Sequence, residues 1–221
     1  FTNFDLFGDE AQYWVWSKNL DYGYYSKPPL LSWVIWIFTN IFGDSFQALK
    51  LIPFFLYFFI SYLVYLISIE LYYDRDLAFI SAVTFYFLPV STFSSFLIST
   101  DIILIFFWLL SLIYLLKIRK NPKKINFIFL GMFLGLSFLA KYAALYFIIS
   151  LLTLFLFDRK LKKIFFKNAL NSFIFLLISI IIVLPNILWN LKNNWITLSH
   201  TSDNVGINRI SINLYQGIEF I

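Results

Sequence analysis

Three carboxylates and two lysines stand out in a chain that is otherwise strongly apolar. Asp9 and Glu10 are adjacent near the start of the chain, and Asp101 lies within the apolar stretch LISTDIILIFFW. Lys27 precedes a double proline, and Lys141 lies within LSFLAKYAALYF. A carboxylate can act as the general base that removes a proton from a hydroxyl, and a fixed ammonium stabilises a phosphate on which negative charge develops. These residue types therefore suit the transfer of a group from a phosphate-containing donor to an alcohol.

Each of these residues also has an ordinary structural explanation. Asp9 and Glu10 can complement the positive end of a surface helix, and Asp101 can cap the helix that follows it. Lys27 can extend its ammonium from an apolar surface into water. Lys141 is the hardest to explain in this way, because a charge at membrane depth costs roughly 2.5–3.5 kcal/mol on insertion scales and usually faces a cavity or a partner.

The inventory of side chains excludes several other kinds of site. The chain has no cysteine and one histidine, which excludes a zinc site built from those ligands. It contains no Gly-rich phosphate loop and no Ser/His/Asp pattern. Carboxylate oxygens can still ligate a divalent cation, so a metal ion held by Asp9 and Asp101, with or without Glu10, stays open as a cofactor.

Composition indicates that membrane helices must position these residues. Hydrophobic residues make up 61% of the chain and charged residues 13%, whereas charged residues make up about 25% of a soluble domain. Several apolar runs approach the roughly 20 residues that cross a bilayer. We predict an all-α fold, a polytopic bundle of about six membrane helices. The apolar runs lie at about 46–72, 77–98, 102–117, 127–140, 143–157 and 169–189.

Basic residues predict the side of the membrane on which each connection lies. The segments 117–126 and 158–167 each carry five basic residues, and Lys and Arg collect in cytoplasmic loops, so we expect no nucleic-acid partner for them. Both segments lie on one side only if 127–157 forms two short helices that turn at Lys141. The first helix, about 21 Å long at 1.5 Å per residue, is shorter than the roughly 30 Å hydrocarbon core. Lys141 is therefore expected below the outer membrane surface.

This topology places all the chemistry-bearing residues on the outer face. The connection at 74–76 becomes cytoplasmic, and the last apolar run leaves the membrane externally near Pro185, so that 190–221 lies outside. His200 falls in that external segment, where it could also be an ordinary surface histidine. The residues that share the external face are Asp9, Glu10, Lys27, Asp101, Lys141 and His200.

The segment 1–45 is predicted to be an external loop with helices that lie along the membrane surface. Residues 28–43 are too short to span comfortably and are rich in Trp, which favours the headgroup region. Residues 9–21 form a second such helix with an acidic first turn. We expect the 221 residues to be a piece of one catalytic membrane module, because the chain begins at Phe1 without Met and ends arbitrarily at Ile221.

Five short segments in a fixed order carry a resemblance to a known family. They are GDEAQYW, GYYSKPPLLSW, STDIILIFFW, FLGMFLGLSFLAKYAALYF and LPNILWNLKNNWITLSHT. Together they resemble the motifs of GT-C fold membrane glycosyltransferases, and most closely the bacterial branch of the protein O-mannosyltransferase superfamily. That branch also contains aminoarabinose and galacturonic acid transferases. The likeness covers nearly the whole chain, and five motifs in the right order are more specific than any one of them.

The resemblance implies a sugar donor on a polyprenyl phosphate and an acceptor lipid, glycan or protein at the outer face of the bacterial inner membrane. Asp9 matches the family's catalytic acid, with Asp101 as its partner and Glu10 as the next candidate. Lys27 and Lys141 would bind the donor phosphate, because an enzyme for this lipid needs an apolar groove that ends in cations.

Two of the resembling segments also contain the residues that we expect to bind substrate, which are Tyr24, Tyr25 and His200. The sequence departs from some relatives at two positions. Ser26 stands where some relatives have an acid directly before the lysine, and Gln12 stands where some have a basic residue. Both differences bear on contacts to the donor phosphate or the acceptor.

Two other classes of protein stay open. A transporter or flippase-like carrier of an anionic lipid or sugar also uses intramembrane Lys and Asp, and Pro185 could break a helix for it. Such a carrier should show inverted repeats, and the sequence shows none. A non-catalytic membrane assembly subunit is the third class, and it predicts that the acids tolerate replacement by Ala.

Overall fold

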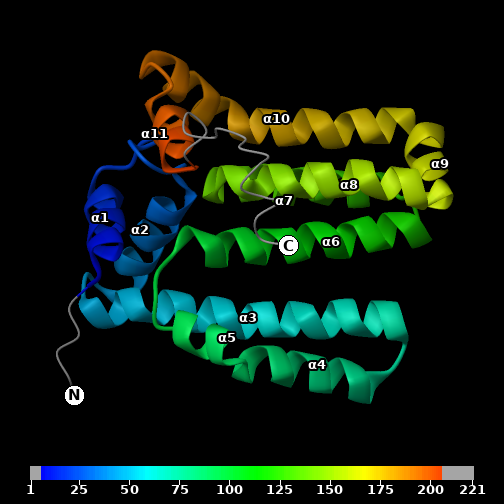
Figure 1. Cartoon of the computed structure of the whole chain (residues 1–221), viewed down its shortest axis with the longest axis horizontal. Coiled ribbons are helices and arrows are strands. Elements are labelled where there is room, and N and C mark those ends of the chain that lie inside the picture. Colours follow the sequence, from blue (N-terminus) through cyan, green and yellow to red (C-terminus); the bar gives the residue numbers. More distant parts are fainter. Residues whose placement is uncertain (1–5, 206–221) are drawn as a thin grey trace, which may run out of the picture.

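The computed structural model describes residues 6–205, which are helical with no strand in that range (Figure 1). The prediction of an all-α membrane bundle is confirmed. The helices are α1 (Gly8–Lys18), α2 (Leu30–Phe42), α3 (Phe46–Tyr72), α4 (Arg75–Phe87), α5 (Pro89–Ser94), α6 (Thr100–Lys120), α7 (Lys124–Ala140), the short 3-10 helix η1 (Tyr142–Ala144), α8 (Leu145–Phe157), α9 (Arg159–Lys167), α10 (Ala169–Lys192) and α11 (Ile196–Val205).

The long helices lie side by side, and the short helices gather at their ends (Figure 1). α7 packs against both α6 and α10, and α3 packs against both α4 and α6. Within residues 6–205, α3, α6 and α10 are long and apolar enough to cross a membrane. The pair 142–157 and 159–167, bent by 107°, could form a fourth span. α2 and α7 are also apolar but have only 13 and 17 residues.

The apolar run at 77–98 does not form one helix. α4 ends at Phe87, Leu88 is extended with φ −57° and ψ 135°, and Pro89 begins α5. The reason is local, because a residue before proline is pushed out of the helical region and proline is favoured at the first position of a helix. The rest of the run continues as a loop to Ser99, which precedes α6.

The chain reverses direction at Lys141. α7 ends at Ala140, and Lys141 is extended with φ −161° and ψ 138°. A single turn, η1, then leads into α8, so α7 and α8 form two arms of a hairpin (Figure 1). As a result, the basic segments 117–126 and 158–167 lie at the same end of the bundle, opposite α1 and α2 (Figure 1).

Two glycines bring α7 unusually close to α10. A Cβ at Gly131 would lie 2.5 Å from the Phe175 carbonyl oxygen, and one at Gly135 would lie 2.9 Å from Cβ of Ile182. The Ser179 hydroxyl donates to the Gly131 carbonyl at 3.0 Å. Small residues spaced by four allow such close helix packing in membranes. This contact fixes the end of α7, and with it Lys141, against α10.

Candidate active site

The polar residues singled out in the sequence come from distant segments and gather at one end of the bundle. α1, α2 and α11 lie there, together with the first turn of α6 and the last turn of α7 (Figure 1). α1 carries Asp9 and Glu10, and the first turn of α6 carries Asp101. Lys141 directly follows α7, and α11 carries His200. The fold therefore assembles at one end what the sequence separates by up to 191 positions.

Asp101 and Lys141 form an ion pair. The Lys141 ammonium donates to Oδ1 of Asp101 at 2.6 Å, joining the first turn of α6 to the break after α7. The Asp101 side chain is 58% exposed and that of Lys141 is 34% exposed. An exposed pair of this kind contributes little to stability. Both side chains thus have a partner and, because they are partly exposed, are also accessible to a ligand.

Tyr13 links Asp9 to the Asp101 neighbourhood. Tyr13 lies one turn after Asp9 on α1 and is buried in the same apolar cluster as Ile102 and Ala140, which flank Asp101 and Lys141 in the sequence. Burial, followed by the negative charges of Asp9 and Asp101, raises the pKa of the Tyr13 phenol to about 12. The phenol is thus a neutral group near both carboxylates.

Asp9 itself is exposed and forms no ion pair or hydrogen bond through its side chain within residues 6–205. Within the same range, no three His, Asp or Glu side chains converge closely enough to hold a metal ion. A divalent cation on Asp9 and Asp101 would therefore depend on water or substrate oxygens for most of its ligands. Residues 6–205 therefore do not make a metal centre by themselves.

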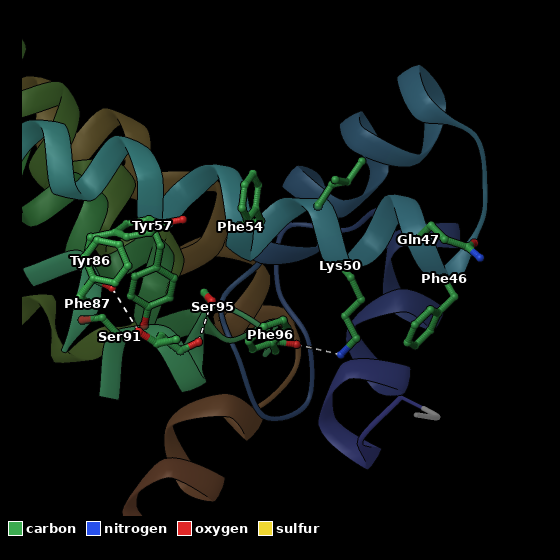
Figure 2. Close-up of a pocket in the computed structure, with 12 residues that line it drawn as sticks. Phe46, Gln47, Lys50, Phe54, Tyr57, Tyr86, Phe87, Ser91, Ser95 and Phe96 are labelled. Atoms are coloured by element: carbon green, nitrogen blue, oxygen red, sulfur yellow. Dashed lines mark hydrogen bonds between the residues drawn. The ribbon is translucent and has the colours of Figure 1, made fainter. Parts of the chain in front are cut away.

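Glu10 is only 2% exposed and has both carboxylate oxygens occupied. It accepts from the Lys50 ammonium at 2.7 and 2.8 Å, from the Ile98 amide at 2.8 Å and from the Phe7 amide at 3.0 Å. Lys50 also donates to the carbonyl of Phe96 at 3.0 Å (Figure 2). These bonds tie α1 to α3 and to the loop before α6, so Glu10 has the geometry of an anchor.

Lys50 was not singled out in the sequence, although it is the lone charged residue at the start of an apolar run. Its signal is weak, because an isolated lysine near a helix end usually extends to the membrane surface. Only the approach of Glu10 from 40 positions away gives it a role.

Lys27 is half-buried and, among residues 6–205, forms no ion pair. Its carbonyl accepts from the Tyr24 amide at 3.1 Å, which closes a tight turn before Pro28. The turn fixes the backbone of Lys27 while the ammonium stays available to an anion.

The two tyrosines of this turn have different surroundings. Tyr24 is buried and stacks on Trp16 with ring centres 4.6 Å apart. Its hydroxyl accepts from the Asp21 amide at 3.1 Å. Tyr25 is exposed, and its ring meets His200 edge-on at 4.8 Å. Tyr24 therefore supports the turn, whereas Tyr25 is exposed and has its ring against that of His200.

The end of α10 holds this turn in place through polar residues that the sequence did not single out as functional. Asn186 donates to the Tyr22 carbonyl at 2.6 Å, and the Trp189 indole donates to Asp21 at 2.7 Å. Gly23 lies against the Trp189 ring, where a Cβ would clash. The segment LPNILWN thus holds the turn that carries Lys27 in place.

A second set of hydrogen bonds joins this end of α10 to the break beside Lys141. The Tyr142 hydroxyl donates to Asn186 at 3.0 Å and accepts from Asn190 at 3.0 Å. The Thr197 hydroxyl donates to the Tyr24 carbonyl at 2.6 Å. The turn with Lys27 and the break with Lys141 are therefore held by one network at the end of α10.

Comparison with known proteins identifies the family. Residues 26–189 match the family model described as dolichyl-phosphate-mannose-protein mannosyltransferase. The chain belongs to this family. The superfamily resemblance inferred from the five motifs is therefore confirmed, and this member of the mannosyltransferase family is an integral membrane protein with several apolar helices.

Two curated relatives are similar over most of the chain. The lipid A galacturonosyltransferase RgtD of Rhizobium johnstonii is 32% identical, over 98% of this chain and 45% of the relative. The lipopolysaccharide core galacturonosyltransferase RgtB of the same organism is 28% identical, over 87% of this chain and 39% of the relative. The chain thus spans less than half the length of these relatives. No solved structure matches it significantly.

Proposed function

We propose that this chain forms the catalytic end of a membrane glycosyltransferase that moves a sugar from a polyprenyl phosphate to a hydroxyl of an envelope lipid or glycan. The observation that carries the proposal is the grouping of Asp9, a carboxylate with no ion pair among residues 6–205, with the exposed Asp101–Lys141 pair around the neutral phenol of Tyr13. The family and the two galacturonosyltransferase relatives support sugar transfer. The site faces outward from a bacterial inner membrane.

Asp9 is the general base in this proposal. The acceptor oxygen attacks the anomeric carbon, its proton passes to the Asp9 carboxylate, and the bond from the anomeric carbon to the phosphate oxygen breaks. The phosphate leaves with the electron pair, and attack from the opposite side inverts the anomeric centre. The phosphate needs little acid help, whereas the hydroxyl needs a base because its pKa is high.

Lys27 and Lys141 stabilise the phosphate as it departs. A charge held in place before the reaction stabilises the developing anion without reorganisation. Asp101 holds Lys141 at 2.6 Å and orients it toward the donor. Tyr13 is a neutral group near the two acids, and Tyr25, whose ring meets that of His200, contacts the sugars. Glu10 and Tyr24 keep these groups in place without touching substrate.

The proposal is tested by comparing envelope lipids from cells with and without the full-length gene. Mass spectrometry of lipid A, core oligosaccharide and surface proteins should show the loss of one sugar in the deletion strain. Purified full-length protein in liposomes should restore it from the lipid-linked donor. An unchanged envelope together with no transfer in liposomes would refute the transferase, and movement of the donor across the liposome membrane would identify a carrier.

A further inference from the structure

An apolar hollow lies at the end of the bundle opposite the candidate active site. Its volume is about 410 Å³, and its lining comes from α8, α9 and α10. Figure 1 shows these three helices meeting at this end, far from α1 and α2. The volume falls within the range of ligand pockets, roughly 300–1,000 Å³. The hollow is therefore large enough to hold part of a small ligand.

The walls of the hollow suit a hydrocarbon. Among the described residues that line it, Ser172 is the one polar side chain, and its hydroxyl donates to the Phe165 carbonyl at 2.8 Å. A hydroxyl bonded in this way does not demand a polar partner from a ligand. Leu152, Phe173 and Leu176 line the hollow and are also exposed. The hollow thus opens to the outside of the bundle, where the membrane supplies acyl chains.

α9 lies across this end of the bundle, at the level of the membrane surface. The bend between the segment 142–157 and α9 is 107°, so α9 turns away from the direction of α8. α10, which is long enough to cross a membrane, begins at Ala169, two residues after α9 ends. A basic helix that lies where a spanning helix enters the bilayer places its charges among the lipid headgroups.

The charges of α9 are not used within the protein. The acid next to them, Asp158, is occupied, because it accepts from Arg119 at 2.6 Å and from the Leu161 amide at 2.9 Å. The five basic residues of α9 are exposed, and none forms an ion pair with any residue in the described range 6–205: Arg159, Lys160, Lys162, Lys163 and Lys167. Basic pockets between membrane helices on the cytoplasmic side bind acidic lipid headgroups.

Lys162 brings the charge and the hollow together. Residues three and four apart on a helix are neighbours, so Lys162 lies beside Phe165 and Phe166, which both line the hollow. Lys163 lies beside Phe166 in the same way. Lys160 is two positions before Lys162, about 200° around the helix, and therefore lies on the opposite side. The spacing thus places Lys162 and Lys163, but not Lys160, at the mouth of the hollow.

We infer that the hollow between α8 and α10 and the adjoining side of α9 form a binding site for an anionic phospholipid of the inner leaflet. One acyl chain lies in the hollow, and the phosphate binds Lys162 and Lys163. The inference does not rest on the proposed function, because the site lies at the other end of the bundle from Asp9 and Asp101. The bound lipid fills the space between two helices, so it should stabilise the protein.

The charge of the site is tested with two lysines of one helix. Native mass spectrometry of the purified full-length protein in detergent measures binding of phosphatidylglycerol and of phosphatidylcholine with the same acyl chains. The wild type should bind phosphatidylglycerol more tightly. Lys162→Gln should weaken phosphatidylglycerol binding about fivefold, the contribution of one lysine beside an anionic lipid surface. Lys160→Gln makes the same change of charge on the other side of α9 and should bind as the wild type does.

The apolar part of the site is tested on α8. Leu152→Trp fills the hollow and should weaken binding of both lipids. Leu156, one turn further along, is exposed and does not line the hollow, so Leu156→Trp should have no effect. Glycerol phosphate, which has the headgroup without acyl chains, should not displace phosphatidylglycerol.

Thermal unfolding gives an independent measurement. A ligand that binds only the folded state raises the melting temperature, so phosphatidylglycerol should stabilise the wild type and Lys160→Gln more than Lys162→Gln. Equal loss of binding in Lys160→Gln and Lys162→Gln would overturn the inference, since it would show only general attraction to a basic surface. Unchanged binding by Leu152→Trp, or displacement by glycerol phosphate, would remove the acyl chain from the hollow and overturn it as well.

Discussion

The contrast between Asp9 and Glu10 shows how much the position of a single residue matters. Adjacent residues on a helix point about 100° apart, so one acid faces outward while the other is buried. Asp9 is exposed, and Glu10 is tied to Lys50 and to two backbone amides. Two carboxylates with the same chemistry therefore have different surroundings, which suit Asp9 to the proposed role of base and hold Glu10 as an anchor.

Asp9→Asn should remove the base and leave the fold intact. General-base catalysis contributes about 10²–10⁴-fold, so turnover should fall at least about 100-fold while the donor still binds. Initial rates of transfer by the purified full-length enzyme, beside its donor affinity, provide the measurement. Near-normal turnover in this variant would remove Asp9 from the reaction.

Glu10→Gln should lower stability instead. Breaking a buried ion pair costs about 3–5 kcal/mol, and we expect the low end because Lys50 is still 21% exposed. Thermal unfolding of Glu10→Gln, Lys50→Met and the double variant checks this. The double variant should lose less than the two single losses combined, because neither charge is left alone. Strict additivity would show that the pair is not coupled.

The Tyr13 phenol gives a pH-dependent test of the site. Its pKa in the folded protein is raised to about 12 by burial and then by Asp9 and Asp101. The folded state therefore holds this proton more tightly than the unfolded state, and stability falls as pH rises from 10 toward 12. Relative to Tyr13→Phe, the wild type should lose about 2–3 kcal/mol over that window. Asp101→Asn should shrink the difference, and an unchanged difference would separate Asp101 from Tyr13.

At the scale of elements, the contact between α7 and α10 sets the position of Lys141. Gly131→Ala places a methyl group 2.5 Å from the backbone oxygen of Phe175, which has no rotamer by which to move aside. Overpacking of this kind costs about 1–3 kcal/mol. We therefore expect a lower melting temperature. We also expect reduced transfer, because α10 holds the turn with Lys27 in place. Gly8→Ala, which meets nothing within 4 Å, is the stability control and should melt as the wild type does.

At the scale of the whole molecule, charge divides the bundle into two ends. Arg119 pairs with Asp158 at 2.6 Å and Lys120 with Glu70 at 2.9 Å at the end opposite the candidate site. Basic loops stay in the cytoplasm, so the opposite end should face out. The chain contains no cysteine, so single introduced thiols report this directly.

An impermeant thiol reagent should label Asn193→Cys in intact cells and Asn121→Cys only after the cells are permeabilised. Both positions are exposed, so accessibility in the membrane decides the outcome. Labelling of Asn121→Cys in intact cells would invert the assigned topology. The same pattern in an Asp9→Asn background shows that loss of activity is not loss of insertion.

The sequence by itself determined the class of the protein and most of its charged site. Long apolar runs can be satisfied in a bilayer only as helices, and the basic segments predicted a turn at Lys141, one residue after the end of α7. The motifs identified the family for the same reason, since each is a short, local pattern. The break at Leu88 could also have been found, because proline restricts the residue before it.

Only the tertiary structure decided which partner each polar residue has. Lys141 meets Asp101 from 40 positions away, Glu10 meets Lys50 from 40, and Trp189 meets Asp21 from 168. Contacts over such separations leave no local pattern, because they depend on how whole helices pack. The same packing leaves Tyr25 open while Tyr24 is buried. Residue type therefore determined what chemistry the chain could offer, and helix packing decided which residues are free to perform it.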